Sequence, residues 1–170
     1  HVQCQPQLDC YPDANSGNIV KNISATNFID TGNGTVEIQP GTVHFHPLSG
    51  GSDADAVIRF IAPTAGIWDV SGQLWRNDNT RNGNGVTVSI FTTVGSATTL
   101  QSANSIGTCC LWVRSNFAAF SVALGAGDSV SFAVNNNGDY SFDSTGIDAT
   151  FSTGAAVPEP GSWAMMVAGL

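Results

Sequence analysis

From residue 35 onward, apolar and polar residues alternate along the chain in short runs with a period of two. The runs are rich in Val, Ile, Phe, Trp and Thr, the residues that favour β-strands. We expect strands at "TVEIQ" (35–39), "TVHFH" (42–46), "AVIRFIA" (56–62), "GIWDVSGQLW" (66–75), "VTVSIFTTV" (86–94), "CCLWV" (109–113), "FAAFSVAL" (117–124), "DSVSFAV" (128–134) and "GIDATFS" (146–152).

The segments between these runs have the composition of turns. Examples are "PTAG" (63–66), "NDNTRNGNG" (77–85), "GAGD" (125–128) and "NNNGDYSFDSTG" (135–146). No helix-period segment and no strand–helix–strand spacing is present. About eight to ten short strands at this spacing predict an all-β fold, an antiparallel two-sheet β-sandwich over 35–154, and a jelly-roll-like connection limits its exposed edges.

The alternation also assigns faces within the run 66–75. One face is expected to carry Trp68, Val70, Gly72 and Leu74, and the other Ile67, Asp69, Ser71, Gln73 and Trp75. Trp75 therefore has three readings: it is partly exposed and contacts a ligand, it forms part of a subunit interface, or it packs over one end of the sandwich.

Residues 1–34 are predicted to form a loop-rich N-terminal arm with Cys4 and Cys10. Two glycosylation sequons begin at Asn22 and Asn33, and such triplets are common by chance in Asn-rich chains. The four cysteines (Cys4, Cys10, Cys109, Cys110) lack zinc spacing and predict disulfides. Either Cys4 bonds Cys10 beside a vicinal pair, or the arm is linked to 109–110 within or between chains; buried free thiols are the alternative.

The composition resembles that of secreted β proteins. Only 11% of the residues are charged, the chain has 19 glycines, and the formal net charge is −8 from 13 acids and five bases. The bases form no cluster in the sequence, so we expect no nucleic-acid partner and no attachment of the folded part to an anionic membrane surface.

Candidate chemistry is sparse in this sequence. His44 and His46 share a strand face and could bind a metal with Asp53 or Asp55, although half-exposed strand histidines explain them as well. Asp139, Asp143 and Asp148 offer hard oxygen ligands for calcium, the one cofactor considered, although such residues also stabilise turns. No nucleophile motif and no marked carboxylate pair is found, so we expect no enzyme.

The chain ends on "VPEP" (Val157, Pro158, Glu159, Pro160) followed by the uncharged run "GSWAMMVAGL". This tail, 155–170, resembles the PEP-CTERM sorting signal of Gram-negative bacteria, with the first half of its hydrophobic anchor. The resemblance implies transient anchoring in the inner membrane, processing by an exosortase, and a final location at the cell surface or outside the cell.

Residues 40–153 also resemble a β-sandwich of PEP-CTERM and related bacterial surface proteins. The landmarks are "RFIAPTAGIW", "GDSVSFAV" and "DSTG", and their order is similar to the C1q/TNF-like jelly roll. Neither resemblance implies catalytic residues.

Two functions follow as hypotheses. The first is a non-catalytic structural protein of the extracellular matrix or biofilm that self-assembles as a fibre or surface layer. The alternative is a carbohydrate-binding module associated with exopolysaccharide, in which Trp75, Trp112 and Tyr140 stack on sugar rings.

Overall fold

The computed structural model describes residues 5–12, 18–30, 36–47, 55–109 and 111–154. This part of the chain folds into thirteen β-strands and contains no helix, so the all-β prediction is confirmed. The strands are β1 (Leu8–Pro12), β2 (Asn18–Asn22), β3 (Phe28–Ile29), β4 (Glu37–Ile38), β5 (Val43–His46), β6 (Ala56–Ile61), β7 (Gly66–Arg76), β8 (Val86–Val94), β9 (Ala97–Ile106), β10 (Ser115–Asn116), β11 (Phe120–Leu124), β12 (Ser129–Asn135) and β13 (Thr145–Thr153).

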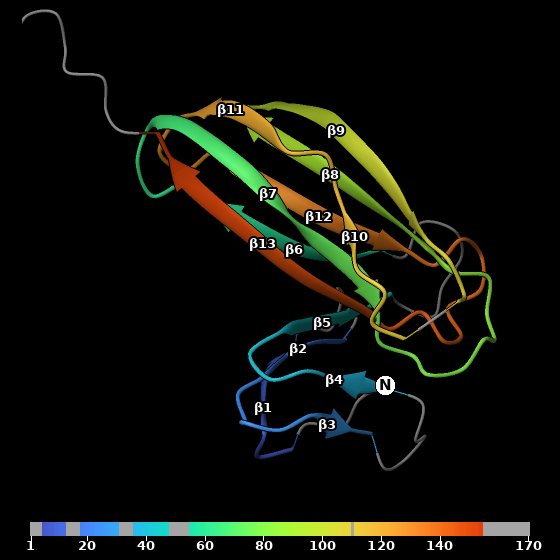
Figure 1. The fold of residues 1–170 in the computed structure, drawn as a ribbon. Helices are drawn as coiled ribbons and strands as arrows, with labels where there is room; N and C mark the ends of the chain where they lie inside the picture. The colour runs from blue at the N-terminus through green and yellow to red at the C-terminus, as the bar shows by residue number, and fades with distance from the viewer. Residues whose placement is uncertain (1–4, 13–17, 31–35, 48–54, 110, 155–170) are drawn as a thin grey trace, which may run out of the picture.

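Two antiparallel sheets pack face to face as a β-sandwich (Figure 1). The larger sheet has the order β1-β2-β5-β13-β7, with β10 and β11 both pairing with the far edge of β7. The smaller sheet has the order β6-β12-β8-β9. The strand orders β5-β13-β7-β11 and β6-β12-β8-β9 are those of a jelly roll, so the predicted fold is confirmed.

The main core lies between the two sheets and consists of side chains that alternate along each strand. Trp68, Val70 and Leu74 of β7 are buried in it, as the period-two pattern predicts. Ile90 of β8 and Phe132 of β12 face them from the smaller sheet. This match between pattern and burial explains why β7, the longest strand, could be recognised with the correct faces.

The N-terminal segment contains more regular structure than the predicted loop-rich arm. β1 and β2 pair with each other, and β2 continues the larger sheet by pairing with β5. Leu8, Val20, Val36 and Ile38 form a second, smaller core beside the sandwich. Both strands are short, and β2 joins the sheet through β5, which is more distant in sequence, so local residue patterns did not indicate them.

Two further differences concern single elements. β9 was not expected, because it is an edge strand with nine of its ten residues at least partly exposed, and it shows no apolar alternation.

The predicted strand at 109–113 is wrong where the structure describes it, since its residues lie in a turn. Trp112 there has a φ of 61°, outside the β region, and its N–H donates to the carbonyl of Arg76 at 3.0 Å.

Within the described residues, no helix is long and apolar enough to cross a membrane.

Candidate functional site

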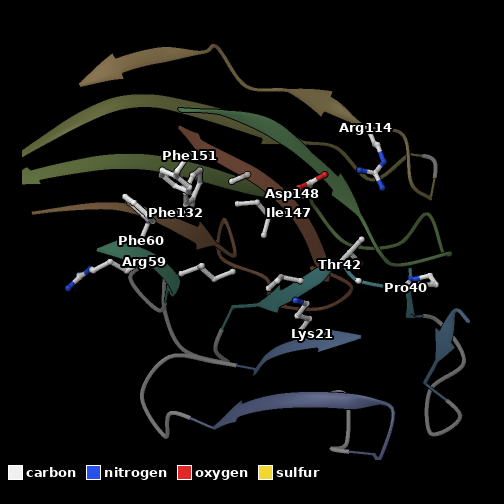
Figure 2. Close-up of a pocket in the computed structure, with 14 residues that line it drawn as sticks. Lys21, Pro40, Thr42, Arg59, Phe60, Arg114, Phe132, Ile147, Asp148 and Phe151 are labelled. Atoms are coloured by element: carbon white, nitrogen blue, oxygen red, sulfur yellow. The ribbon is translucent and has the colours of Figure 1, made fainter. Parts of the chain in front are cut away.

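One cavity with a defined lining lies at the open edge of the sandwich. β13 pairs with β5 only over Thr145–Ile147, but with β7 as far as Thr153. Beyond Ile147, β5 therefore leaves the edge of β13, and β6 of the other sheet borders the opening. A groove of about 600 Å³ results, lined by residues of both sheets (Figure 2).

Phenylalanine rings form the floor of this groove. Phe60 of β6 and Phe151 of β13 stack with their centroids 4.0 Å apart and their planes 12° apart. Phe132 meets Phe151 edge to face at 6.2 Å, and Trp68 meets Phe60 at 5.0 Å. Because each ring is packed against another, the floor is a rigid apolar surface.

Polar side chains form the rim. Lys21, Thr42, Arg59, Arg114 and Asp148 are among the lining residues, but the Arg59 guanidinium points away from the phenylalanine rings in Figure 2. Its Nε donates to Ser131 Oγ at 3.0 Å, on the face of the smaller sheet opposite to Phe60. The groove thus combines an apolar floor with hydrogen-bonding groups along its length, a typical arrangement for a ligand site.

Arg114 is held by two glutamines and an indole ring. Its Nη2 donates to Gln39 Oε1 at 2.7 Å and its Nη1 to Gln73 Oε1 at 3.2 Å. The guanidinium carbon lies 4.0 Å from the centroid of Trp75, a cation–π contact. These neutral partners fix the direction of the side chain.

The structure does not support Trp75 as a glycan contact. The side chain is fully buried, and its Nε1 donates to Asn77 Oδ1 at 2.8 Å. It does point to the outer face of the sheet, as the alternation predicts, but Arg114 covers it there. The alternation identified the face correctly. It could not show that Arg114, which comes from a loop distant in sequence, covers the indole.

The other two predicted aromatic contacts do not line the groove either. Trp112 is half-buried, and its Nε1 donates to the carbonyl of Glu37 at 3.2 Å. Tyr140 is 44% exposed and meets the ring of His46 edge to face at 6.4 Å. The three aromatics therefore form no common surface with the groove.

The three aspartates proposed for calcium are not brought together. Asp148 lies on β13 opposite Gln73 and lines the groove. Asp139 accepts a hydrogen bond from the N–H of Ser141 at 3.0 Å, which lowers its pKa. Among the described residues, no group of three or more His, Cys, Asp or Glu side chains is placed to hold a metal ion.

Asp143 has an unusual environment. Its side chain is buried, and neither carboxylate oxygen has a hydrogen-bond partner in the described part of the chain. Burial, and then the nearby charges of Asp139 and Asp78, raise the pKa of Asp143 to about 8, although Arg76 acts in the opposite direction. The carboxyl group is therefore mainly protonated at neutral pH.

The histidine pair is structural where the structure describes it. His44 is fully buried, burial lowers its pKa to about 3, and its Nδ1 lies 3.2 Å from Nδ2 of Asn77. His46 lies on the same strand and is partly exposed. Of the suggested acidic partners, Asp53 lies outside the described residues, and Asp55 belongs to no metal-binding group within them.

The first sequon is also structural. Asn22 is fully buried, and its Nδ2 donates to the carbonyls of Thr26 and Ile38, each at 2.8 Å. Asn33 lies outside the described residues.

Cys10 and Cys109 are not free thiols, which argues against that alternative for these two residues. Cys4 and Cys110 lie outside the described residues, so the disulfide pairing stays a prediction.

The sorting-signal residues 157–160 also lie outside the described part of the chain, so the resemblance of the tail to a sorting signal stays a prediction.

The groove residues Phe60 and Phe151 were not identified as site residues from the sequence. Phe60 and Phe151 lie in different sheets and read as ordinary strand residues in their local patterns. Only the jelly-roll pairing places them in contact, so a correct strand order was the signal needed to find them.

Comparisons with known proteins add no family assignment. Neither the protein-family models nor the curated proteins gave a match. Among solved structures, the chain is similar to one described as "CBM4 structure and function", with 12% identity and a TM-score of 0.40, covering 70% of this chain and 75% of that one. It is also similar to tripeptidyl peptidase 2, with 15% identity and a TM-score of 0.36, covering 86% of this chain and 13% of that one. Likenesses at these scores carry no argument about function.

Proposed function

We propose that this chain is a non-catalytic carbohydrate-binding β-sandwich module that acts outside the cell. The observation that carries the proposal is the groove with the Phe60–Phe151 floor and the polar rim. A sugar ring has an apolar C–H face and a periphery of hydroxyl groups, so it matches an aromatic floor bordered by hydrogen-bonding side chains.

The size and openness of the groove favour a chain of sugars over a small compact ligand. Its volume of about 600 Å³ lies within the ordinary range for ligand sites. Lining residues come from β2, β6, β12 and β13 and from the loop before β5, so the groove crosses the edge of the sandwich. An extended polymer can lie along such a path with its ends in solvent.

The lining of the groove favours binding over hydrolysis. Glycoside hydrolysis generally uses two carboxyl groups on either side of the scissile bond. Among the described lining residues, Asp148 is the one carboxylate. We therefore propose a role in attachment to a polysaccharide, without chemistry on it.

The proposed location rests on the sequence. Low charge and the turn-rich β pattern are typical of secreted proteins, and the "VPEP" tail resembles a sorting signal. We propose that the protein reaches the surface of a Gram-negative cell through exosortase processing of this tail. Exopolysaccharide at that surface is the natural ligand class.

The test is binding of the full chain to a panel of soluble polysaccharides, neutral and acidic, by affinity electrophoresis and titration calorimetry. We expect Phe60→Ala to lower the affinity for a bound polymer by about tenfold or more, because it removes half of the stacked floor. Phe60→Leu, which keeps apolar bulk in the core, separates the loss of the ring from a loss of folding.

Tyr140→Ala is the matched control, since this exposed aromatic lies outside the groove. It should bind like the unchanged protein. The proposal is overturned if no polysaccharide binds, or if Tyr140→Ala abolishes binding while both Phe60 variants retain it.

Self-association is a second candidate function, favoured by one observation. β9 is an edge strand of ten residues, Ala97–Ile106, that pairs only with β8 within the described chain. It has no charged residue and no proline, and Leu100 is 54% exposed. Natural edge strands usually carry charges or prolines that prevent pairing with another copy, so β9 is the segment through which a fibre or layer could form.

A further inference from the structure

The smaller sheet has an unpaired strand edge on each of its two sides. Its order is β6-β12-β8-β9, and within the described residues β6 pairs only with β12 and β9 only with β8. Neither strand contains a proline. The backbone N–H and C=O groups along such edges can pair with a strand of another chain.

Charged side chains do not block either edge. β9 carries no charged residue, and Arg59 is the one charged residue of β6. Arg59 stands opposite Ser131 of β12, and its Nε donates to Ser131 Oγ at 3.0 Å. The arginine side chain therefore lies over its own sheet and away from the free edge of β6.

Half-buried apolar side chains lie between the sheets at both borders of the sandwich. Phe120 and Val122 of β11 lie at the border that β11 shares with β9 (Figure 1). Phe60 of β6 and Phe151 of β13 lie at the opposite border, where the groove opens. Contact between the two borders removes both sets from water, and burial of apolar surface is the main favourable term in protein association.

We propose that copies of this chain associate side by side, with β9 of one copy pairing with β6 of the next, which specifies the second candidate function, self-association, and rests on it. The smaller sheet has four strands, and each neighbouring pair in it is antiparallel. β6 and β9 therefore run in opposite directions, so a second copy that continues the sheet in the same orientation meets β9 with an antiparallel β6. The antiparallel ladder is slightly the more stable of the two kinds per residue.

The two surfaces in this contact are different, so each added copy leaves one β6 and one β9 free at the ends of the assembly. Contacts of this kind produce open filaments unless the rotation between copies closes a ring. The groove opens on the same side as the free edge of β6. Association and polysaccharide binding therefore compete for this side of the molecule.

The experiment blocks one edge at a time in the full chain and then mixes the two variants. Ala103→Lys blocks β9, where Ala103 is exposed. Val57→Lys with Ile61→Lys blocks β6, because both side chains lie on the outer face of the sheet beside Arg59 and Ile61 is 61% exposed. A lysine on an edge strand disfavours pairing with a second strand.

Sedimentation velocity should show that each variant alone stays monomeric at concentrations where the unchanged chain forms large species. The equimolar mixture should contain a species of twice the monomer mass and nothing larger, because one variant supplies β6 and the other supplies β9. Ala126→Lys, which adds the same charge in an exposed turn, should associate like the unchanged chain.

Three results would overturn the proposal. If the β6 variant forms dimers by itself, β9 pairs with β9 of another copy. If the mixture stays monomeric, the two edges do not meet. If the associated species of the unchanged chain survives denaturing, non-reducing electrophoresis, disulfides hold the copies together.

Hydrogen exchange of the unchanged chain tests the same contact without any substitution. Amide groups of both β6 (Ala56–Ile61) and β9 (Ala97–Ile106) should exchange more slowly at high protein concentration than at low concentration. Protection of β9 without protection of β6 contradicts the proposal. None of these measurements involves a polysaccharide, so their failure leaves the proposed carbohydrate binding untouched, and failure to bind sugar leaves this association intact.

Discussion

At the scale of single residues, Gly146 makes room for the indole of Trp75. A Cβ atom at this position of β13 would lie 2.2 Å from Cε2 of the ring, which is fully buried and cannot move aside. We expect Gly146→Ala to lower the free energy of unfolding by about 1–3 kcal/mol, as overpacking does in other cores.

Chemical denaturation measures this change. Gly107→Ala is the matched control, because a Cβ there meets nothing within 4 Å, and its effect should stay within about 0.5 kcal/mol. Equal stability of the two variants would show that β13 and Trp75 do not pack in this way.

Asp143 makes the stability depend on pH. Its pKa is raised in the folded state to about 8 from a model value of 3.8, so between these values the folded protein binds more protons than the unfolded chain. Stability therefore falls as pH rises through this window, by up to 1.4 kcal/mol for each pH unit. Burial lowers the pKa of His44 to about 3, so its contribution to the free energy of unfolding rises with pH below 6.5, opposite to that of Asp143. The loss from Asp143 should accordingly be visible between about pH 6.5 and pH 8.

Urea denaturation at a series of pH values tests this expectation. Asp143→Asn removes the titrating group and should flatten the curve above about pH 6.5. Asp128→Asn is the comparison, because Asp128 lies in another turn, where the N–H groups of Gly95 and Gly125 lower its pKa, so it titrates below this range. A wild-type stability that is constant from pH 6.5 to 8 would contradict the assignment.

At the scale of elements, β9 decides whether copies of the chain associate. A lysine on an edge strand prevents pairing with a second strand, so Ala103→Lys should keep the protein monomeric at concentrations where the unchanged chain associates. Sedimentation velocity over a range of concentrations measures this. Ala126→Lys adds the same charge in an exposed turn and should associate normally. A wild-type chain that stays monomeric throughout, or an Ala103→Lys variant that associates, would contradict pairing through β9.

The contrast between β7 and β9 shows what the sequence can predict. β7 packs one face on the core, so its apolar residues alternate and both its extent and its faces were predictable. β9 is exposed along nearly its whole length, so nothing in its local pattern separates it from a polar loop. The reverse occurred at 111–113, where apolar residues resemble a strand in the sequence although the structure has no strand there.

The same reasoning explains the site predictions. A ligand contact was one of three readings of Trp75, which shares its strand face with polar residues, but Arg114 covers it from a segment far along the chain. Phe60 and Phe151 meet only because β6 and β13 border one opening of the jelly roll. Local patterns therefore predicted strands and faces, whereas the groove depended on the pairing of distant strands.

At the scale of the whole molecule, the few bases of this acidic chain are distributed over different faces of the fold. Arg59 lies beside Ser131 on the outer face of the smaller sheet. Arg114 lies over Trp75 on the outer face of the larger sheet. Lys21 stands opposite Asp9 in the pair of β1 and β2.

The position of β13 has a consequence for how the chain is made. β13 is the last strand of the described chain, yet it lies inside the larger sheet between β5 and β7, and β12 likewise lies between β6 and β8. A nascent chain that ends before Ser129 lacks the strand between its two halves in both sheets, so neither sheet can close at that stage. The larger sheet can close only after β13 has been made, and until then the facing edges of β5 and β7 are available for misassembly.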